Sequence, residues 1–407
     1  MRSALLALCA AALPAGALLA QTPATPPTTN PPVATDTSAR RPAAAAADTA
    51  PKITFGGFVD GYYAYDSGRP ANFDRSFAGG ALFTTQPSRH NEFNVNLAFA
   101  EAKLDAPRYR GRLALQFGTS VQSNYSGEAR NGQVSGPSVQ QFLQEAVAGY
   151  RIADKLWVDG GIMFSNVGME GFISRDNLTY SRALVSDYSP YYSAGVKFTY
   201  AASPTVSVRL DVVNGWQNIS ENNSGKGAGL RLDYTPNPNA TLSYYNLFTD
   251  EAGTRLRTFN GVGAKVTRGA VTVLGQADVG TQRRAPGVAG TSSWYGLLGV
   301  ARVQVAPVVA VSGRLERYAD PDQVILSTGS RQVAVNAPGG PGTGTVANPA
   351  FRGNGASLGV DVQPVSRVLW RTEVRGFRNR DAVFPNGPTG APRRDNRFVV
   401  TSLALTL

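Results

Sequence analysis

Apolar residues alternate with small or polar residues along the chain from Ile53 onward. The pattern comes in runs of about 10–14 residues, close to the length of a tilted strand that crosses a membrane. In the run Asn91–Asp105, for example, Phe93, Val95 and Leu97 fall on one face. Alternation with a period of two is typical of a β-strand with one apolar and one polar face. We count about sixteen such runs, an even number within the range of bacterial outer-membrane barrels.

The connections between these runs are alternately short and long. Short connections include 153–155, 268–269 and 364–367, and long ones include 67–90, 168–190 and 319–355. A transmembrane barrel has short turns on its periplasmic side and long loops outside. The sequence therefore predicts an all-β fold over residues 53–407. We expect a transmembrane, antiparallel, up-and-down β-barrel of about 16 strands with both termini in the periplasm.

The polar face of each predicted strand is expected to point into the barrel. In the run Arg112–Val121, Leu113 and Phe117 share the apolar face, and Arg112 and Gln116 share the other. A charged side chain that faces lipid near the mid-plane costs about 2–4 kcal/mol, so these charges indicate a wet lumen. The lumen-lining candidates are Arg112, Gln116, Asp159, Arg209, Asp211, Arg231, Asp233, Arg314, Glu316, Arg371, Glu373 and Arg375. Alternatively, they pair across strands and stiffen the wall. The excess of arginine predicts a lumen that mildly favours anions.

The long connection 168–190, GMEGFISRDNLTYSRALVSDYSP, is the third long loop and lies between the fifth and sixth predicted strands. In sixteen-stranded diffusion porins this loop folds inward as the constriction. We therefore take Glu170, Arg175, Asp176 and Arg182 as pore-constriction candidates. In the alternative interpretation, Asp176 and Arg182 only pin the loop to the wall.

The N-terminal segments predict export. Residues 1–20 carry Arg2, an apolar core and small residues, which is typical of a secretory signal peptide. Cleavage is expected after Ala20, with Ala17 as the second choice. Residues 21–52 are rich in Pro, Ala and Thr and predict a disordered periplasmic tail. The single cysteine, Cys9, lies in the signal peptide, so the mature chain has no disulfide or thiolate metal site.

Composition and motifs argue against an enzyme. The pattern Gly355–Gly359 (GASLG) matches a hydrolase elbow, but it opens a predicted strand, and the one histidine, His90, lies in a long loop. The net charge of +11 is spread along the strands, which does not indicate nucleic-acid binding. We expect no catalytic residue, cofactor or metal site.

Four segments resemble the OmpL-like family of β-barrel porins. They read FGGFVDGYYAYD, NEFNVNLAFAEAKLDAPRYRGRLALQFG, GMEGFISRDNLTYSRAL and DVVNGWQNISENN. The resemblance covers most of Ile53 to about Thr249 and is weaker beyond it. It implies a pore in the outer membrane and names no solute.

We therefore predict a porin in the outer membrane of a Gram-negative bacterium. Small hydrophilic solutes would diffuse passively through a water-filled lumen that the loop 168–190 narrows. The expected partners are outer-membrane lipid and such solutes. A homotrimer, usual for sixteen-stranded diffusion porins, is left open because the sequence shows no interface. The alternative function is a plugged structural or adhesive surface barrel whose long loops bind partners.

Overall fold

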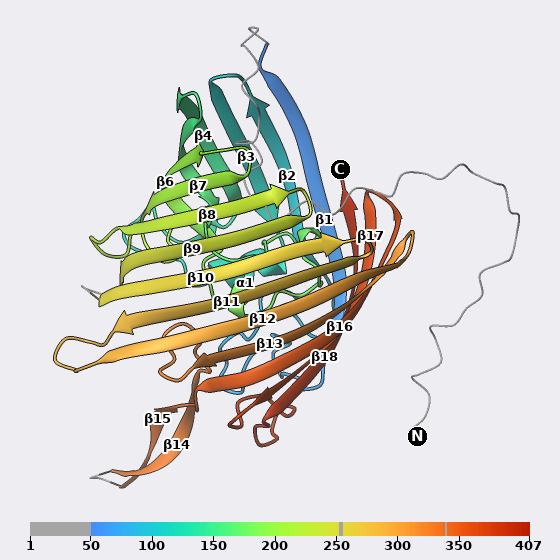
Figure 1. The fold of residues 1–407 in the computed structure, drawn as a ribbon. Coiled ribbons are helices and arrows are strands. Elements are labelled where there is room, and N and C mark those ends of the chain that lie inside the picture. Colours follow the sequence, from blue (N-terminus) through green and yellow to red (C-terminus); the bar gives the residue numbers. More distant parts are fainter. Residues whose placement is uncertain (1–49, 252–254, 338–339) are drawn as a thin grey trace, which may run out of the picture. The chain divides into compact units, whose positions relative to one another are not determined.

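Sixteen antiparallel strands close into one barrel in the computed structural model (Figure 1). The structure describes residues 50–251, 255–337 and 340–407. The predicted signal peptide and the predicted tail, apart from its last three residues, lie outside the described residues. Each barrel strand pairs with its neighbours in the chain, and β1 (Lys52–Asp66) pairs with β18 (Asp395–Thr406) to close the barrel. The predicted all-β barrel of about sixteen strands is confirmed.

The remaining elements follow in chain order. The barrel strands are β2 (Phe93–Asp105), β3 (Tyr109–Phe117), β4 (Leu143–Ala153), β5 (Leu156–Phe164), β6 (Tyr192–Ala201), β7 (Val206–Val213), β8 (Gly227–Asn237), β9 (Ala240–Glu251), β10 (Arg255–Arg268), β11 (Val271–Arg283), β12 (Thr291–Ala306), β13 (Val309–Asp320), β16 (Phe351–Val365) and β17 (Val368–Asn379). The other elements are α1 (Thr119–Tyr125), α2 (Pro137–Gln140), η2 (Ser174–Asp176), α3 (Leu184–Asp187) and a hairpin of β14 (Ser330–Ala337) and β15 (Gly340–Ala347).

The alternation in the sequence corresponds to the two faces of the wall. In β12, exposed residues such as Leu297 alternate with buried ones such as Leu298 over ten successive positions. The exposed face carries large apolar side chains on nearly every strand, with Leu315 71% exposed and Leu358 70% exposed. A continuous apolar surface of this kind indicates a lipid environment. Within the described ranges, no helix has the length and apolar composition needed to cross a membrane.

One predicted strand and one predicted loop differ clearly from the structure. The run Arg112–Val121 was expected to be one strand, but β3 ends at Phe117 and α1 follows. Gly118 makes this turn with a φ of 130°, and a side chain there would lie 2.3 Å from the carbonyl oxygen of Asn96. Val121 is therefore buried inside the barrel and does not share the lipid face. The long connection 319–355 also contains the hairpin β14–β15, which alternation alone did not indicate.

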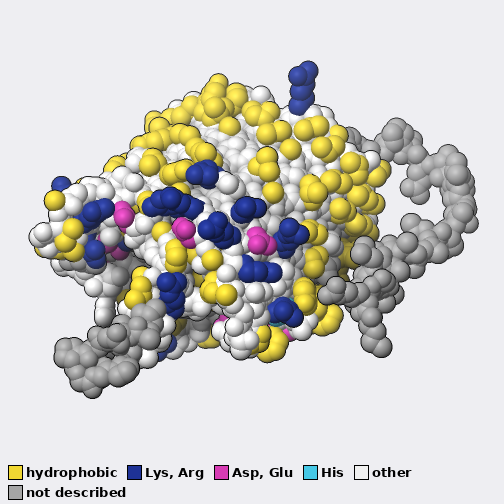
Figure 2. All heavy atoms as spheres, turned by 90° about the horizontal axis from the view of Figure 1, so that it is seen from below, with side chains coloured by type: hydrophobic (Ala, Val, Ile, Leu, Met, Phe, Trp, Pro, Cys, Tyr) yellow, Lys and Arg dark blue, Asp and Glu magenta, His cyan; other side chains and the backbone are white. Residues whose placement is uncertain are grey.

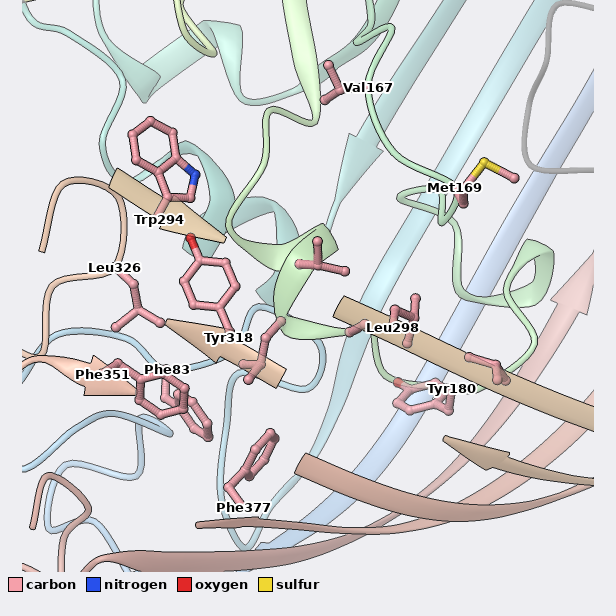
Figure 3. Close-up of a cluster of buried hydrophobic side chains, with 14 of the residues drawn as sticks. Phe83, Val167, Met169, Tyr180, Trp294, Leu298, Tyr318, Leu326, Phe351 and Phe377 are labelled. Carbon is pink, nitrogen blue, oxygen red and sulfur yellow. The ribbon is translucent and has the colours of Figure 1, made fainter. Parts of the chain in front are cut away.

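Part of the barrel interior is apolar (Figure 3). Phe83, from the connection between β1 and β2, packs edge-on against Phe377 with ring centroids 4.6 Å apart. It also contacts Phe351 at 6.0 Å and Phe384 at 5.1 Å. These rings belong to a buried cluster that includes Trp294 and other inward side chains from the wall. The expectation of a wholly wet interior is wrong for this region, because the first long loop folds inward and buries its aromatic residues.

Candidate functional site: the inward loop and the lumen wall

The connection 168–190 lies inside the barrel. All of its residues are buried except Gly171, Arg175, Asp176 and Tyr188. Contacts with widely separated strands fix its course across the interior. The Met169 N–H donates to Gln276 on β11, and the Ser174 hydroxyl donates to Asp60 on β1 at 2.8 Å.

Four charged residues of β13 and β17 form a buried cluster beneath the loop. Arg314 pairs with Glu373, and Arg375 pairs with Glu316, each with a nitrogen–oxygen distance of 2.6 Å. All four side chains are at most 1% exposed. Buried ions are stable only when their remaining hydrogen bonds are satisfied. Here the backbone of the loop supplies many of the missing partners.

The loop meets this cluster through its segment 181–184. The N–H of Ser181 donates to Glu373 Oε2 at 2.8 Å, and Arg314 Nη1 donates to the Ser181 carbonyl at 2.6 Å. Arg375 Nη1 donates to the Arg182 carbonyl at 2.7 Å. Leu184 begins α3, and its N–H donates to Glu316 Oε2 at 2.7 Å. These predicted lumen-lining residues face inward, but the loop covers them.

Two other wall arginines hold earlier parts of the loop. Arg371 Nη1 donates to the Ser174 carbonyl at 2.6 Å, and its Nη2 donates to the Asn177 carbonyl at 3.0 Å. Asp361 pairs with the same guanidinium at 2.9 Å. Arg231 holds the start of the loop, because its Nη1 donates to the Gly168 carbonyl at 2.9 Å.

Glu170 and Arg182, two of the predicted constriction residues, hold the loop together internally. Both are buried. Glu170 Oε2 accepts the Ala183 N–H at 2.7 Å, and burial raises the pKa of Glu170 while the charge of Arg314 opposes this. Arg182 Nη2 donates to the Ser186 carbonyl at 2.6 Å, and its guanidinium lies 3.5 Å from the centre of the Tyr191 ring.

Arg175 and Asp176 occupy a different position, at the tip of the loop. Their side chains are 30% and 15% exposed and lie 3.4 Å apart. Arg175 Nη1 also donates to Thr406 on β18 at 2.6 Å. Burial raises the pKa of Asp176, and the positive charges of Arg175, Lys265 and Arg112 lower it. The tip therefore lies within the field of cations on β3 and β10.

The inner wall near this tip carries paired charges. Arg112 on β3 binds Glu101 at 2.6 Å and also contacts Glu145. Gln116 is buried and donates to the Gln141 carbonyl. The predicted residues Arg209 and Asp211 pair at 2.7 Å, and Arg231 and Asp233 pair at 2.9 Å. Asp159, also predicted, pairs at 2.6 Å with Arg110, which was not predicted.

Our site prediction omitted several inward charges. Lys265 lies on β10, where the neighbouring Val266 is 46% exposed on the lipid face. Lys103 on β2 pairs with Glu101 at 2.9 Å. Parity along β10 identifies Lys265, which occupies the face opposite Val266. Parity does not identify Lys103, because the pairing of β1 with β2 shifts in register between Asp60 and Gly61. Beyond this shift the odd-numbered residues of β2 turn inward, so Leu97 is buried and does not share the lipid face with Phe93 and Val95.

The enzyme-like features do not form a reactive site. The pattern Gly355–Gly359 lies within β16 and not at a strand–turn–helix junction. His90 Nδ1 accepts the Asp66 N–H at 2.9 Å, and burial lowers the pKa of His90. In the part of the chain that the structure describes, no three His, Cys, Asp or Glu residues are placed to hold a metal ion.

The closed sixteen-stranded barrel with an inward loop defines the class of outer-membrane porins. Residues 52–407 match the family described as "Putative beta-barrel porin-2, OmpL-like". The chain belongs to this family of outer-membrane porins, which confirms the resemblance seen in the sequence. No curated protein is similar enough to this chain to count as a relative.

Solved structures support the fold. The anion-selective porin from Comamonas acidovorans has a TM-score of 0.57 at 10% identity, covering 88% of this chain and 100% of that one. The trimer form of OmpT from Vibrio cholerae has a TM-score of 0.53 at 10% identity, covering 88% and 100%. OmpF of Salmonella typhi, in complex with daunomycin, has a TM-score of 0.52 at 13% identity, covering 88% and 98%. At these identities the similarity concerns the fold alone.

Proposed function

We propose that small hydrophilic solutes diffuse passively through a water-filled lumen, narrowed by the loop 168–190, that favours anions. The protein is then a channel and not an enzyme. The narrowing is supported by the contacts of the loop with the wall on both sides of the interior. Asp60 and Arg371 hold it near η2, and Gln276 holds it near Met169. Fixing the loop in one conformation costs several kcal/mol of conformational entropy. These hydrogen bonds are therefore needed to hold the loop in place.

The anion preference rests on one observation: several acids are less exposed to solvent than the cations with which they pair. Arg112 is 21% exposed and its partner Glu101 is 11% exposed. Lys103, which shares Glu101, is 45% exposed. At the tip of the loop, Arg175 is twice as exposed as Asp176. A solute in the lumen therefore meets mainly positive charge, and a ring of cationic side chains favours anions. The anion selectivity of the porin from Comamonas acidovorans agrees with this proposal.

Planar-bilayer recording of the purified protein tests the proposal. We expect stepwise conductance and, in a salt gradient, a reversal potential that reports anion preference. A cation-selective reversal potential would contradict the charge argument while leaving the pore intact. A silent bilayer would contradict the pore itself.

The aromatic cluster around Phe83 supports a second candidate function, a plugged barrel that acts as a structural or adhesive surface protein. Phe77, Phe351, Phe377 and Phe384 pack with Phe83 in the interior. A barrel plugged by this cluster predicts no conductance in the wild type, and conductance once Phe83→Ala loosens the cluster.

A homotrimer is the proposed assembly, since one structural neighbour is a trimer form. The mass of the detergent-solubilised protein, measured by light scattering, distinguishes the trimer from a monomer.

A further inference from the structure

A groove of about 640 Å3 lies on the outer surface of the barrel, where β12, β13, β16 and β17 approach their long loops. It is lined by Arg317, Arg352, Arg378, Arg380, Tyr295 and Asn354. The strand neighbours Tyr318, Phe351 and Phe377 are buried inside the barrel. Since successive side chains of a strand point to opposite faces, the strand arginines Arg317, Arg352 and Arg378 point away from the lumen.

Strand register places two of these arginines in one row. Arg317 on β13 lies opposite Asn354 on β16, and Asn354 lies opposite Arg378 on β17. The row ends at Asp395 on β18, opposite Arg378. Neighbouring strands are about 4.8 Å apart, so Arg317 and Arg378 begin about 10 Å from each other. Flexible arginines at this spacing can reach the same anionic group.

Among the described residues, the four groove arginines form no ion pair, although Asp395 lies opposite Arg378. Arg317 Nε donates to the Tyr295 hydroxyl at 2.9 Å, and Nη1 donates to Asn354 Oδ1 at 3.0 Å. Both acceptors are uncharged, so they orient the guanidinium without cancelling its charge. Across residues 50–251, 255–337 and 340–407, no carboxylate lies within 4.0 Å of the four arginine side chains. Most inward arginines, by contrast, are paired with acids.

An apolar surface begins directly beside the groove. Leu315, two residues before Arg317 on β13, is 71% exposed. Leu358 and Val374 are exposed on β16 and β17. Figure 2 shows Lys and Arg gathered across the face seen from below, next to an area of hydrophobic side chains. A lipid whose acyl chains cover such an apolar surface would bring its headgroup to the arginines.

We infer that this groove binds the phosphorylated headgroup of a lipid in the outer leaflet. Guanidinium groups suit phosphate because their planar N–H donors match its oxygens in pairs. The long-loop end of a barrel faces outward, which places the groove at the level of outer-leaflet headgroups. The site is separate from the lumen, so the inference does not depend on the proposed channel activity.

Native mass spectrometry of the full protein in detergent micelles tests this inference, with bis-phosphorylated lipid A as the probe. We expect retained lipid A on the wild-type protein and weaker retention on the double variant Arg317→Gln/Arg378→Gln. Each basic residue near an anionic lipid surface contributes about a factor of five in affinity, so the double variant should bind roughly thirty-fold more weakly. Both residues are exposed, so the variant is expected to keep the barrel fold.

The matched control is Arg268→Gln/Arg367→Gln, which removes the same charge from exposed arginines at the short-turn end. Lipid A binding by this control should equal that of the wild type. Equal binding by the groove variant and the control would overturn the inference. Displacement of lipid A by millimolar inorganic phosphate would identify a site for soluble anions and would also overturn it. Retention of a diacylglycerol, which has no phosphate, as strongly as lipid A would show that the apolar surface alone binds lipid and would also overturn the inference.

Discussion

Arg375 on β17 donates a hydrogen bond to the carbonyl oxygen of Arg182 in the inward loop, at 2.7 Å. The same guanidinium binds Glu316 on β13. One wall residue therefore joins two strands and the loop, and the charges that looked like a pore lining are covered by the segment that they hold.

Substitution of Arg375 by Met should release the loop. Glu316 would remain buried without this partner, and breaking a buried ion pair costs roughly 3–5 kcal/mol. We expect a lower thermal unfolding temperature and faster proteolysis within residues 168–190. Arg378→Gln on the same strand removes an exposed charge and should change the free energy of unfolding by less than about 0.5 kcal/mol. An equal response of both variants would show that Arg375 does not hold the loop.

Deletion of residues 173–183 should raise the single-channel conductance. This segment contains η2 and the Ser181 contacts, and its removal leaves the wall arginines facing water. A deletion of equal length in the hairpin β14–β15 serves as the control and should leave conductance unchanged. Unchanged conductance in the 173–183 variant would show that this segment does not narrow the pore.

Charge changes at the tip of the loop should alter ion selectivity in opposite directions. Arg175→Glu adds negative charge beside Asp176 and should shift the reversal potential toward cations. Asp176→Asn removes a negative charge that offsets the nearby cations and should therefore increase the preference for anions. Arg268→Glu, at the end of β10 and on its exposed face, is the control outside the lumen. Selectivity that stays constant in both tip variants would show that the tip does not face the permeating ions.

The free energy of unfolding should fall as the pH is lowered through the range in which His90 becomes protonated. Burial lowers the pKa of His90 in the fold, and its Nδ1 accepts the Asp66 N–H, which requires the neutral ring. The unfolded chain therefore binds more protons below about pH 6.5, so the free energy of unfolding rises with pH in this window. His90 is the only histidine, and His90→Asn should flatten the dependence of thermal unfolding on pH between about 5 and 7. An unchanged slope in this variant would assign the effect to carboxylates.

The sequence was sufficient for the barrel and its family, because alternation reports directly which face of each strand meets lipid. It was insufficient for the role of each inward charge. Arg112 and Arg314 have the same signature in the sequence, yet Arg112 is partly exposed and Arg314 lies beneath the loop. The difference depends on the course of the loop, which is fixed by contacts far apart in the chain. The inward packing of Phe83 escaped prediction for the same reason.

The contact between Ser181 and Glu373 spans 192 residues of chain. Glu373 lies on the penultimate strand of the barrel, so the loop cannot reach its final position until almost the whole wall has been assembled. Contacts of such long range form late, because the chain must lose much of its freedom before they can stabilise anything. The inward loop thus takes its final position at the end of biogenesis, and a barrel arrested before β17 inserts would lack the contact between Ser181 and Glu373.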